Sequence, residues 1–460
     1  MFQKILVANR GEIAVRIVRA CREMGIQTVL AHSEVDRNSL AAALADETVC
    51  VGPASSERSY LHVPNIVSAA LLSAADAIHP GYGFLSENAS FAEVCAEVGL
   101  VFIGPPPSVL DAFGDKVQAR RLMREAGLPV IPGTDEPLLS RDAARDAAAT
   151  IGYPLMLKAA AGGGGRGMRI ARDPSELARQ FSAAQLEAQN AFGNGALYLE
   201  SLLEGARHVE IQIAADNAGD IVHLGERDCS VQRRHQKLIE ERPAPGISAA
   251  TRQALGEAAV RGAAAVGYRG MGTMEFLLDR RGRFWFLETN CRIQVEHPVT
   301  EMVTALDLVK TQIRLAAGES LPWSQAQIRF SGHAIECRIT AEDPNRDFAP
   351  AAGVVETLLL PGGPGVRVDT HVFPGYEFPP HYDSLLAKLI VWGADRAEAL
   401  ARLGRALRET RIGGLATNIP YLQEVLADPR FQVGGVGIDY RPASWLARTS
   451  ESVSAGTAAS

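Results

Sequence analysis

The chain has 460 residues, of which 47% are hydrophobic and 22% charged, and its net charge is −7. This composition is that of an ordinary globular protein of about three domains, and the charge argues against general nucleic-acid or membrane-surface binding. No apolar run is long enough to span a bilayer or to form a signal peptide, and the six scattered cysteines indicate reduced thiols and a cytoplasmic location.

Short apolar runs alternate with helical patterns in the first part of the chain. Residues 4–8 and 27–33 are typical of strands, and residues 12–25 have the apolar spacing of a helix. This alternation of strand-like and helix-like segments continues to about residue 105. It predicts an α/β domain, with a mostly parallel sheet covered by helices, that ends near residue 113.

The rest of the chain divides at loop-like segments. The stretch PGTDEP opens a smaller block with two strands and a glycine run, and a β-rich block follows. Residues 321–327 are typical of a connector, and the small polar tail at 447–460 predicts disorder. We therefore expect domains at 1–113, at 114–320 with a lid at about 130–203, and at 328–446.

The glycine run AAAGGGGRGMRI lies at residues 159–170. It is not a P-loop, because Gly165 is not followed by Lys-Ser/Thr, and it is not a dinucleotide fingerprint, because a strand follows it. A glycine-rich turn between strands can fold its bare amides over phosphates, with Lys158 supplying a positive charge. A mobile surface hairpin is an equally good interpretation.

Two apolar strands, TMEFLLD and RFWFLET, are connected through a short glycine-containing loop and predict a hairpin. If Asp279 pairs with Phe284, Glu275 lies opposite Glu288, and Asn290 lies one pleat further on the same face. Opposed carboxylates need a counter-ion, and oxygen ligands of this kind suit Mg²⁺. A register shifted by one residue would instead leave one glutamate in solvent.

The stretch ETNCRIQVEH, residues 288–297, places a polar side chain at every second position. If the run is extended, these side chains share one face, and a solvated strand face is the alternative to a functional row. The members of the row are Glu288, Asn290, Arg292, Gln294 and Glu296.

A basic cluster lies within residues 226–245. Such a charge run is usually solvated, but apolar residues interrupt it, so it could line a cleft that takes phosphate or carbonate. Its cations are Arg227, Arg233, Arg234, His235 and Lys237.

The motifs together resemble biotin carboxylase, an ATP-grasp enzyme, over about residues 1–446. The resemblance implies a Rossmann-like N-terminal domain, an ATP-grasp domain with a mobile lid, and a C-terminal domain. It implies ATP-dependent carboxylation of biotin by bicarbonate through carboxyphosphate. The segments that carry it are HPGYGFLSEN, FIGP, GDK, KAAAGGGGRGM, ERDCSVQRRHQKLIEE, GTMEFL, ETNCRIQVEHPVTEM and PPHYDSLLAKLIVWG.

The resemblance also implies roles for individual residues. Contacts to ATP are implied for Lys116, Lys158, Gly164, Gly165, Glu200, Leu203, His208, His235, Glu275 and Glu288. Ligands of Mg²⁺ or Mn²⁺ are implied at Glu275, Glu288 and Asn290. A bicarbonate and biotin pocket is implied at Lys237, Arg292, Gln294, Val295 and Arg338, with Glu296 as the general base and Arg338 stabilising the biotin enolate. Without the resemblance, the two histidines and Arg338 would be interpreted as structural.

The chain lacks a Met-Lys-Met biotinylation signature, so biotin is expected on a separate carrier protein, with a carboxyltransferase subunit downstream, or else the chain is a fragment of a longer carboxylase. The family commonly forms homodimers, and Arg19 and Glu23 are weak candidates for that interface. The acceptor could be acetyl-CoA, propionyl-CoA, another acyl-CoA or pyruvate. Another ATP-grasp carboxylate ligase and a non-catalytic scaffold are the competing hypotheses. Cys291 departs from the family pattern and is expected to be a buried, inert thiol.

Overall fold

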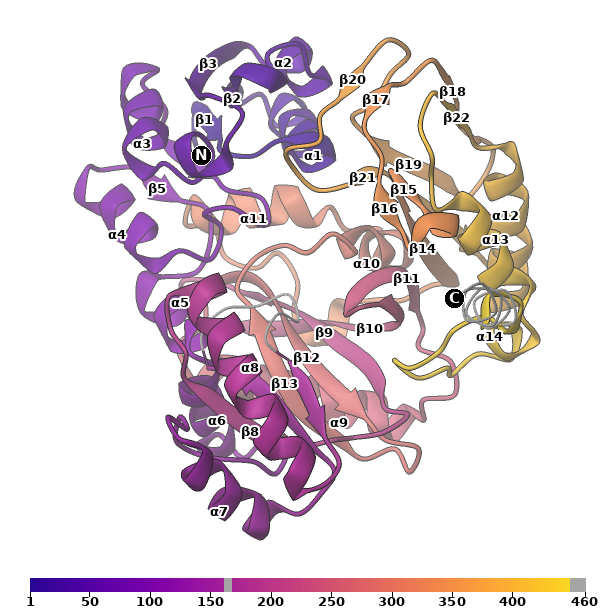
Figure 1. The fold of residues 1–460 in the computed structure, drawn as a ribbon. Helices are drawn as coiled ribbons and strands as arrows, with labels where there is room; N and C mark the ends of the chain where they lie inside the picture. Colours follow the sequence, from indigo (N-terminus) through magenta and orange to yellow (C-terminus); the bar gives the residue numbers. More distant parts are fainter. Residues whose placement is uncertain (161–167, 447–460) are drawn as a thin grey trace, which may run out of the picture.

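The computed structural model describes residues 1–160 and 168–446 (Figure 1). A parallel five-stranded sheet begins the chain, in the order β3-β2-β1-β4-β5, as the sequence predicted. Apolar residues of α1 are buried against this sheet, which explains the helical spacing of its sequence. The elements are β1 (Lys4–Val7), α1 (Gly11–Glu23), β2 (Gln27–Ser33), α2 (Leu40–Leu44), β3 (Glu47–Gly52), α3 (Val63–Leu72), β4 (Ala77–His79), α4 (Ala89–Glu97) and β5 (Val101–Phe102).

A small three-stranded sheet, in the order β7-β6-β8, forms the second unit. β6 and β7 are antiparallel neighbours, so the glycine run does connect two paired strands, although residues 161–167 themselves lie outside the described residues. Helices α7 and α8 pack on this sheet. The elements are α5 (Pro107–Gly114), α6 (Lys116–Glu125), α7 (Arg141–Ile151), β6 (Leu155–Ala159), β7 (Arg169–Ala171), α8 (Pro174–Phe192) and β8 (Leu197–Ser201).

An antiparallel eight-stranded sheet, in the order β13-β12-β9-β10-β11-β14-β21-β19, organises the rest of the molecule. It continues across the expected connector at 321–327, because β11 pairs with β14. Its strands are β9 (Arg207–Ala215), β10 (Ile221–Arg233), β11 (Gln236–Arg242), β12 (Gly270–Leu278), β13 (Phe284–Asn290), β14 (His333–Thr340), β19 (Val366–Thr370) and β21 (Leu385–Gly393).

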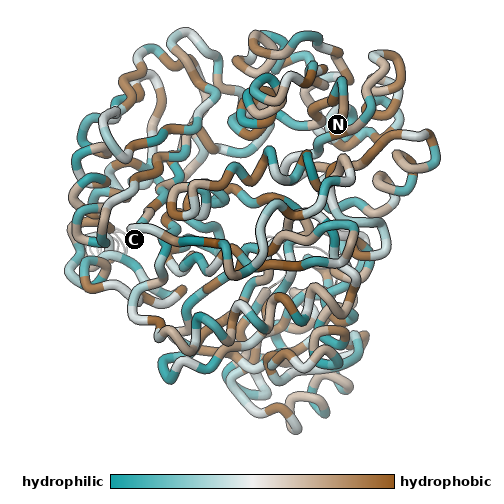
Figure 2. Tube along the Cα trace, turned by 180° about the vertical axis from the view of Figure 1, so that it is seen from behind, coloured by the Kyte–Doolittle hydropathy of each residue, from teal (hydrophilic) through white to brown (hydrophobic). Residues whose placement is uncertain are grey.

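Helices cover this sheet, and α12 and α13 lie outside β14 and β21 (Figure 1). Hydrophobic and hydrophilic residues alternate along the outer helices (Figure 2), which is typical of helices that bury one face. The remaining elements are α9 (Ala249–Ala265), α10 (His297–Thr304), α11 (Leu308–Ala316), β15 (Glu342–Asp343), β16 (Ala349–Pro350), β17 (Gly353–Val354), β18 (Thr357–Leu359), β20 (Glu377–Phe378), α12 (Arg396–Glu409), β22 (Arg411–Gly413), α13 (Ile419–Ala427) and α14 (Pro429–Val433).

The predicted hairpin is present as β12 and β13, but its turn differs from the prediction. Leu278, not Asp279, pairs with Phe284. A bulge then shifts the register, so that Glu275 still lies opposite Glu288 as predicted. The pairing at the turn was wrong, and the pairing of the two carboxylates was correct.

The polar row from residue 288 to residue 297 is not one extended strand. β13 ends at Asn290, a turn follows at Val295 and Glu296, and α10 begins at His297. The alternation predicted a straight row because period-two spacing cannot show where a strand ends. The side chains of the row nevertheless converge on one site.

Candidate active site

Strand β9 supplies the floor of the site because its residues alternate between two faces. Val209, Ile211 and Ile213 pack in the core, while His208 and Glu210 point to the other face. Glu210 is fully buried and pairs in register with Glu275 on β12. Glu210 was not predicted from the sequence, although the alternation of polar and apolar residues in RHVEIQIAA could have indicated it.

Lys237, on β11, is the cation at the centre of the site. Its Nζ donates to Glu210 Oε2 at 2.6 Å, to Glu275 Oε1 at 2.8 Å and to Glu296 Oε1 at 2.7 Å. Burial alone would lower the pKa of Lys237, but the three carboxylates raise it well above its usual range. The ammonium therefore stays charged and draws acids from β9, β12 and the turn before α10 to one point.

Arg227, on β10, is a second buried cation of this cluster. It is 0% exposed, and its Nε donates to Glu210 Oε1 at 2.6 Å while its Nη2 donates to Gln294 Oε1 at 3.0 Å. Gln294 in turn donates to Glu275 Oε1 at 2.8 Å. The basic cluster predicted from sequence thus lines the site in part, through Arg227 and Lys237.

The other cations of the basic cluster lie away from the carboxylates. Arg233 and Arg234 both pair with Asp347, each at 2.7 Å. His235 is exposed in the turn between β10 and β11. The solvated interpretation of the cluster therefore holds for this turn.

Glu275 and Glu288 form the carboxylate pair expected to hold a metal. Lys116 Nζ lies 2.5 Å from Glu288 Oε2, and this lysine keeps the pKa of Glu288 below its usual range. Burial opposes ionisation of Glu275, but Lys237 and His208 bring its pKa well below normal. His208 Nε2 lies 2.8 Å from Glu275 Oε2.

These residues fit a hard divalent cation. Two ionised carboxylates share one face of the hairpin, and the Asn290 amide bonds both Glu275 and Arg292, at 2.8 and 2.9 Å. Hard oxygen donors of this kind suit Mg²⁺, which keeps its remaining positions for water and phosphate oxygens. Protein cations already gather around the same oxygens, as expected of a site with excess negative charge.

Arg292 connects this site to the first part of the chain. Its Nε donates to Glu87 Oε2 at 3.0 Å, and Glu87 Oε1 accepts the Cys291 amide at 2.8 Å. Glu87 lies within HPGYGFLSEN, and the sequence predicted no role for it. The long-range contact is decided by the tertiary structure and has no sequence signal of its own.

Glu296 lies between two cations at the start of α10. Besides Lys237, it contacts Arg338 Nη2 at 3.0 Å through Oε2. Burial opposes its ionisation, yet Lys237 and Arg338 lower its pKa below the usual range. Arg338 also reaches Glu240 Oε1 at 2.6 Å, and burial raises the pKa of Glu240 to about 7 although Arg338 opposes this shift.

Lys158 and Glu200 meet on the small sheet. The Lys158 ammonium and the Arg120 guanidinium both donate to the Glu200 carboxylate, which is 2% exposed. The carboxylate of Glu200 therefore orients two cations, and Leu203 lies partly buried just after β8. Gly164 and Gly165 lie outside the described residues.

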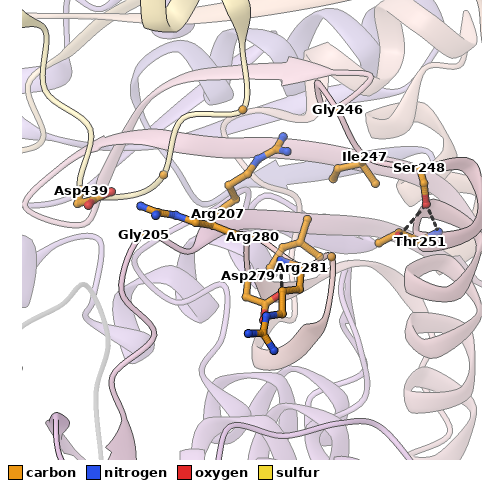
Figure 3. A pocket seen from close by; sticks show the side chains of 14 residues that line it. Gly205, Arg207, Gly246, Ile247, Ser248, Thr251, Asp279, Arg280, Arg281 and Asp439 are labelled. Atoms are coloured by element: carbon orange, nitrogen blue, oxygen red, sulfur yellow. Dashed lines mark hydrogen bonds between the residues drawn. The ribbon is translucent and has the colours of Figure 1, made fainter.

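A cavity of about 530 Å³ lies at the start of α9, beside the end of the β12–β13 hairpin (Figure 3). Its walls include Arg207, Arg280 and Arg281, and none of the predicted site residues that the structure describes lines it. The candidate active site therefore lies away from this cavity.

Three family models match the chain in order. They are described as "Biotin carboxylase, N-terminal domain" at residues 1–110, "Carbamoyl-phosphate synthase L chain, ATP binding domain" at 115–324 and "Biotin carboxylase C-terminal domain" at 336–440. A biotin carboxylase of Nostoc sp. is 56% identical over 439 residues, covering 95% of this chain and 98% of the relative. The chain belongs to the biotin carboxylase family.

Solved biotin carboxylases share the fold. One from Campylobacter jejuni, described as a β-γ-ATP complex, has a TM-score of 0.94 and 45% identity, covering 97% of this chain and 99% of that one. The biotin carboxylase domain dimer of Hydrogenobacter thermophilus 2-oxoglutarate carboxylase, in complex with MgADP, ADP and bicarbonate, has a TM-score of 0.93 and 48% identity, covering 96% and 97%.

The predicted α/β ATP-grasp fold and the identification with biotin carboxylases are therefore confirmed. The chain is an enzyme, an ATP-dependent ligase that carboxylates biotin. Biotin carboxylase matches at both ends of the chain exclude the carbamoyl-phosphate-forming alternative. No helix in the two described ranges is long and apolar enough to cross a membrane.

Proposed function

We propose that this chain carries out the first half-reaction of a biotin-dependent carboxylase, with biotin presented on a separate carrier protein. One observation carries the proposal. The Lys237 ammonium joins Glu296 to Glu275, within 2.7 and 2.8 Å, so a candidate base lies directly beside a candidate metal site. Bicarbonate and the terminal phosphate of ATP would meet at this point.

Glu296 is the proposed general base. Its neighbours keep it ionised, so it can accept a proton, but they also make it a weak base. A bicarbonate ion held by Lys237, Arg292 and the Val295 backbone would draw Lys237 toward its own charge. The basicity of Glu296 would then rise at the moment when bicarbonate loses its proton and attacks the γ-phosphate.

On the nucleotide side, Lys116, Lys158 and the flap that contains Gly164 and Gly165 are proposed to hold the phosphates. Glu200 and Leu203 are proposed at the adenine hinge, and His208 and His235 as further nucleotide contacts. Mg²⁺ held by Glu275, Glu288 and Asn290 would offset the charge of the phosphates. His208 acts through Glu275, since its imidazole contacts that carboxylate.

Arg338 is proposed to receive biotin. Attack by bicarbonate on the γ-phosphate releases ADP and forms carboxyphosphate, which splits into CO₂ and phosphate. Phosphate takes the N1′ proton of biotin, and the resulting enolate attacks CO₂ to give carboxybiotin. The Arg338 guanidinium lies 3.0 Å from Glu296 and supplies a fixed positive charge for the enolate oxygen.

The proposed partners are a biotin carboxyl carrier protein, a carboxyltransferase subunit and a second copy of this chain. The Hydrogenobacter relative is described as a dimer, which supports the last of these. Acetyl-CoA is the proposed final acceptor, with propionyl-CoA, another acyl-CoA or pyruvate as alternatives. We propose a cytoplasmic location, because the six cysteines are all free thiols.

The test is ATP hydrolysis with Mg²⁺ and bicarbonate, with and without free biotin, on wild type and Glu296→Gln. We expect hydrolysis that requires bicarbonate, rises with biotin and falls at least roughly a hundredfold in the variant. Glu97→Gln, at an exposed glutamate of α4, is the matched control and should match wild type. Hydrolysis indifferent to biotin would contradict the proposal.

A further inference from the structure

Lys388 lies in the middle of β21 and is fully buried. It is the only charged residue of this strand, whose sequence is LLAKLIVWG. Its Nζ donates to the Val295 carbonyl oxygen at 3.1 Å, lies 3.0 Å from Glu12 Oε1 and 3.7 Å from Asp369 Oδ2. The bond to Val295 places this lysine against the turn that presents Glu296.

The sheet places Lys388 on the same face as the biotin-site arginine. Lys388 pairs in register with Arg338 on β14 and with Asp369 on β19, and directly opposed residues share a face. The neighbouring Leu389 points to the opposite face and packs in the core with α12 and α13. The side of the sheet that carries Lys388 is therefore the side that carries the active site.

Acids from two distant parts of the chain lie beside the Lys388 ammonium. Glu12 comes from α1, and its Oε1 also accepts a hydrogen bond from the Tyr82 hydroxyl. Asp369 is itself paired with Arg367 at 2.7 Å. Burial would lower the pKa of Lys388, but Glu12, Asp369 and Glu336 raise it overall, so the ammonium stays charged.

The carbonyl groups around the turn are each held by a different partner. The Gln294 oxygen accepts from the His297 amide at 3.3 Å, and the Glu296 oxygen accepts from the Val299 amide at 3.2 Å. The Val295 oxygen accepts from Lys388. The Val295 carbonyl is therefore held from a distant strand, whereas the Gln294 and Glu296 carbonyls are held within the turn and the start of α10, where the His297 ring nitrogen Nδ1 also lies 2.8 Å from the Gln294 oxygen.

We propose that Lys388 is a positioning residue that fixes the Val295–Glu296 peptide and thereby sets the geometry in which bicarbonate meets its base. This inference rests on the proposed function of Val295 and Glu296. The peptide is planar, so a rotation of its carbonyl also turns the bond that leads to the Cα of Glu296. A charge-assisted hydrogen bond to that carbonyl resists the rotation more strongly than a neutral one would.

Lys388 could instead serve only to neutralise Glu12 and Asp369. The two roles differ in what they predict for the substrates. Loss of a merely neutralising charge lowers stability and affects ATP and bicarbonate alike. Loss of the carbonyl contact acts on bicarbonate, because the nucleotide ligands Lys116 and Glu288 lie on α6 and β13 and do not touch Lys388.

The experiment compares three variants of the full chain in bicarbonate-dependent ATP hydrolysis. Lys388→Met keeps the length and removes the ammonium. Lys388→Met combined with Glu12→Gln removes a charge of each sign, so that it remains folded if the single variant does not. Glu12→Gln alone is the control, because it breaks the ion pair and leaves the bond to Val295.

We expect both variants that lack Lys388 to raise the KM for bicarbonate, or to lower kcat/KM for it, roughly tenfold to a hundredfold. Their KM for ATP should stay within about threefold of the wild-type value. In Glu12→Gln, the KM values for ATP and for bicarbonate should both stay within about threefold of wild type. A folded double variant with wild-type bicarbonate kinetics would overturn the inference, as would an equal effect from Glu12→Gln. If wild-type hydrolysis does not need bicarbonate, the proposed function fails instead.

Discussion

Glu275 and Glu288 lie directly opposite each other on β12 and β13. Their pairing is shifted by one residue from the register next to the turn, where Leu278 pairs with Phe284. Phe276 pairs with Phe286, so a regular ladder would place Leu287 opposite Glu275. The bulge at Leu287 restores the opposition and brings both carboxylates to one face. A local irregularity of the hairpin is thus part of the candidate metal site.

Glu288→Gln should weaken the response to Mg²⁺ with little cost to the fold. The side chain of Glu288 is 38% exposed, and among the described residues its one ion pair is with Lys116, so we expect the free energy of unfolding to change by about 1 kcal/mol or less. The concentration of Mg²⁺ needed for half-maximal ATP hydrolysis should rise at least roughly tenfold, because a neutral amide replaces a charged carboxylate ligand.

A Mg²⁺ titration of ATP hydrolysis measures this effect, and urea unfolding measures stability. Glu97→Gln serves again as the matched glutamate control, since it lies exposed on α4. An unchanged Mg²⁺ requirement in Glu288→Gln would show that Glu288 is not a ligand.

Glu240 should make stability depend on pH. Burial raises its pKa from 4.5 to about 7, so the folded protein keeps a proton that the unfolded chain loses in this range. The contribution of Glu240 to the free energy of unfolding is therefore fully present below pH 4.5 and is lost as the pH rises to about 7. Glu240→Gln should remove that loss.

Urea unfolding at about pH 5 and about pH 8 gives the comparison. Wild type should lose more unfolding free energy between the two pH values than Glu240→Gln does. Equal losses in the two proteins would mean that Glu240 does not hold a proton in the folded state.

Glu200→Gln should affect ATP and leave bicarbonate unaffected. The Glu200 carboxylate accepts hydrogen bonds from Lys158 and Arg120. A neutral amide at this position would bind the two cations more weakly. We expect the KM for ATP to rise roughly tenfold and the free energy of unfolding to fall by about 2 kcal/mol. Steady-state kinetics with each substrate varied in turn gives the two KM values separately. A rise in the KM for bicarbonate alone would contradict the assignment of Glu200 to the nucleotide side.

Cys50 should be the one fast-reacting thiol of the native protein. It is exposed, whereas the other five cysteines are buried. Burial raises the pKa of the Cys291 thiol well above its usual range, so this residue should be inert despite its place beside the candidate metal ligands. A thiol reagent should label about one equivalent, and Cys50→Ser should abolish the labelling. Rapid inactivation that persists in Cys50→Ser would point to Cys291.

Local patterns were enough to predict much of the fold. Alternating strands and helices predicted the first sheet, and the two apolar runs around the loop of arginines and a glycine predicted the β12–β13 hairpin. The same patterns gave the wrong partner for Phe284, because the residues of the turn at Asp279 do not reveal the bulge between Phe276 and Glu275. They failed again after Asn290, because alternating polar residues continue into a turn and a helix start.

The candidate site was predicted where its residues follow one another in the chain, as in the row from Glu288 to Glu296. Glu210 was missed although its strand alternates, because nothing in the sequence places that strand beside β12. Glu87 and Lys388 were missed for a stronger reason. Each contacts the row from a segment that is distant in sequence, and such a contact leaves no local pattern.

The sequence by itself determined the family, the sheet-and-helix order and the residue types available for the chemistry, because these depend on composition, spacing and motif. Only the tertiary structure decided which charges meet. Lys237 contacts Glu210, Glu275 and Glu296 at once because three separate segments bury their carboxylates around it. Long-range pairing of buried charges is set by how strands and domains pack, since each buried ion requires a partner wherever the fold places one.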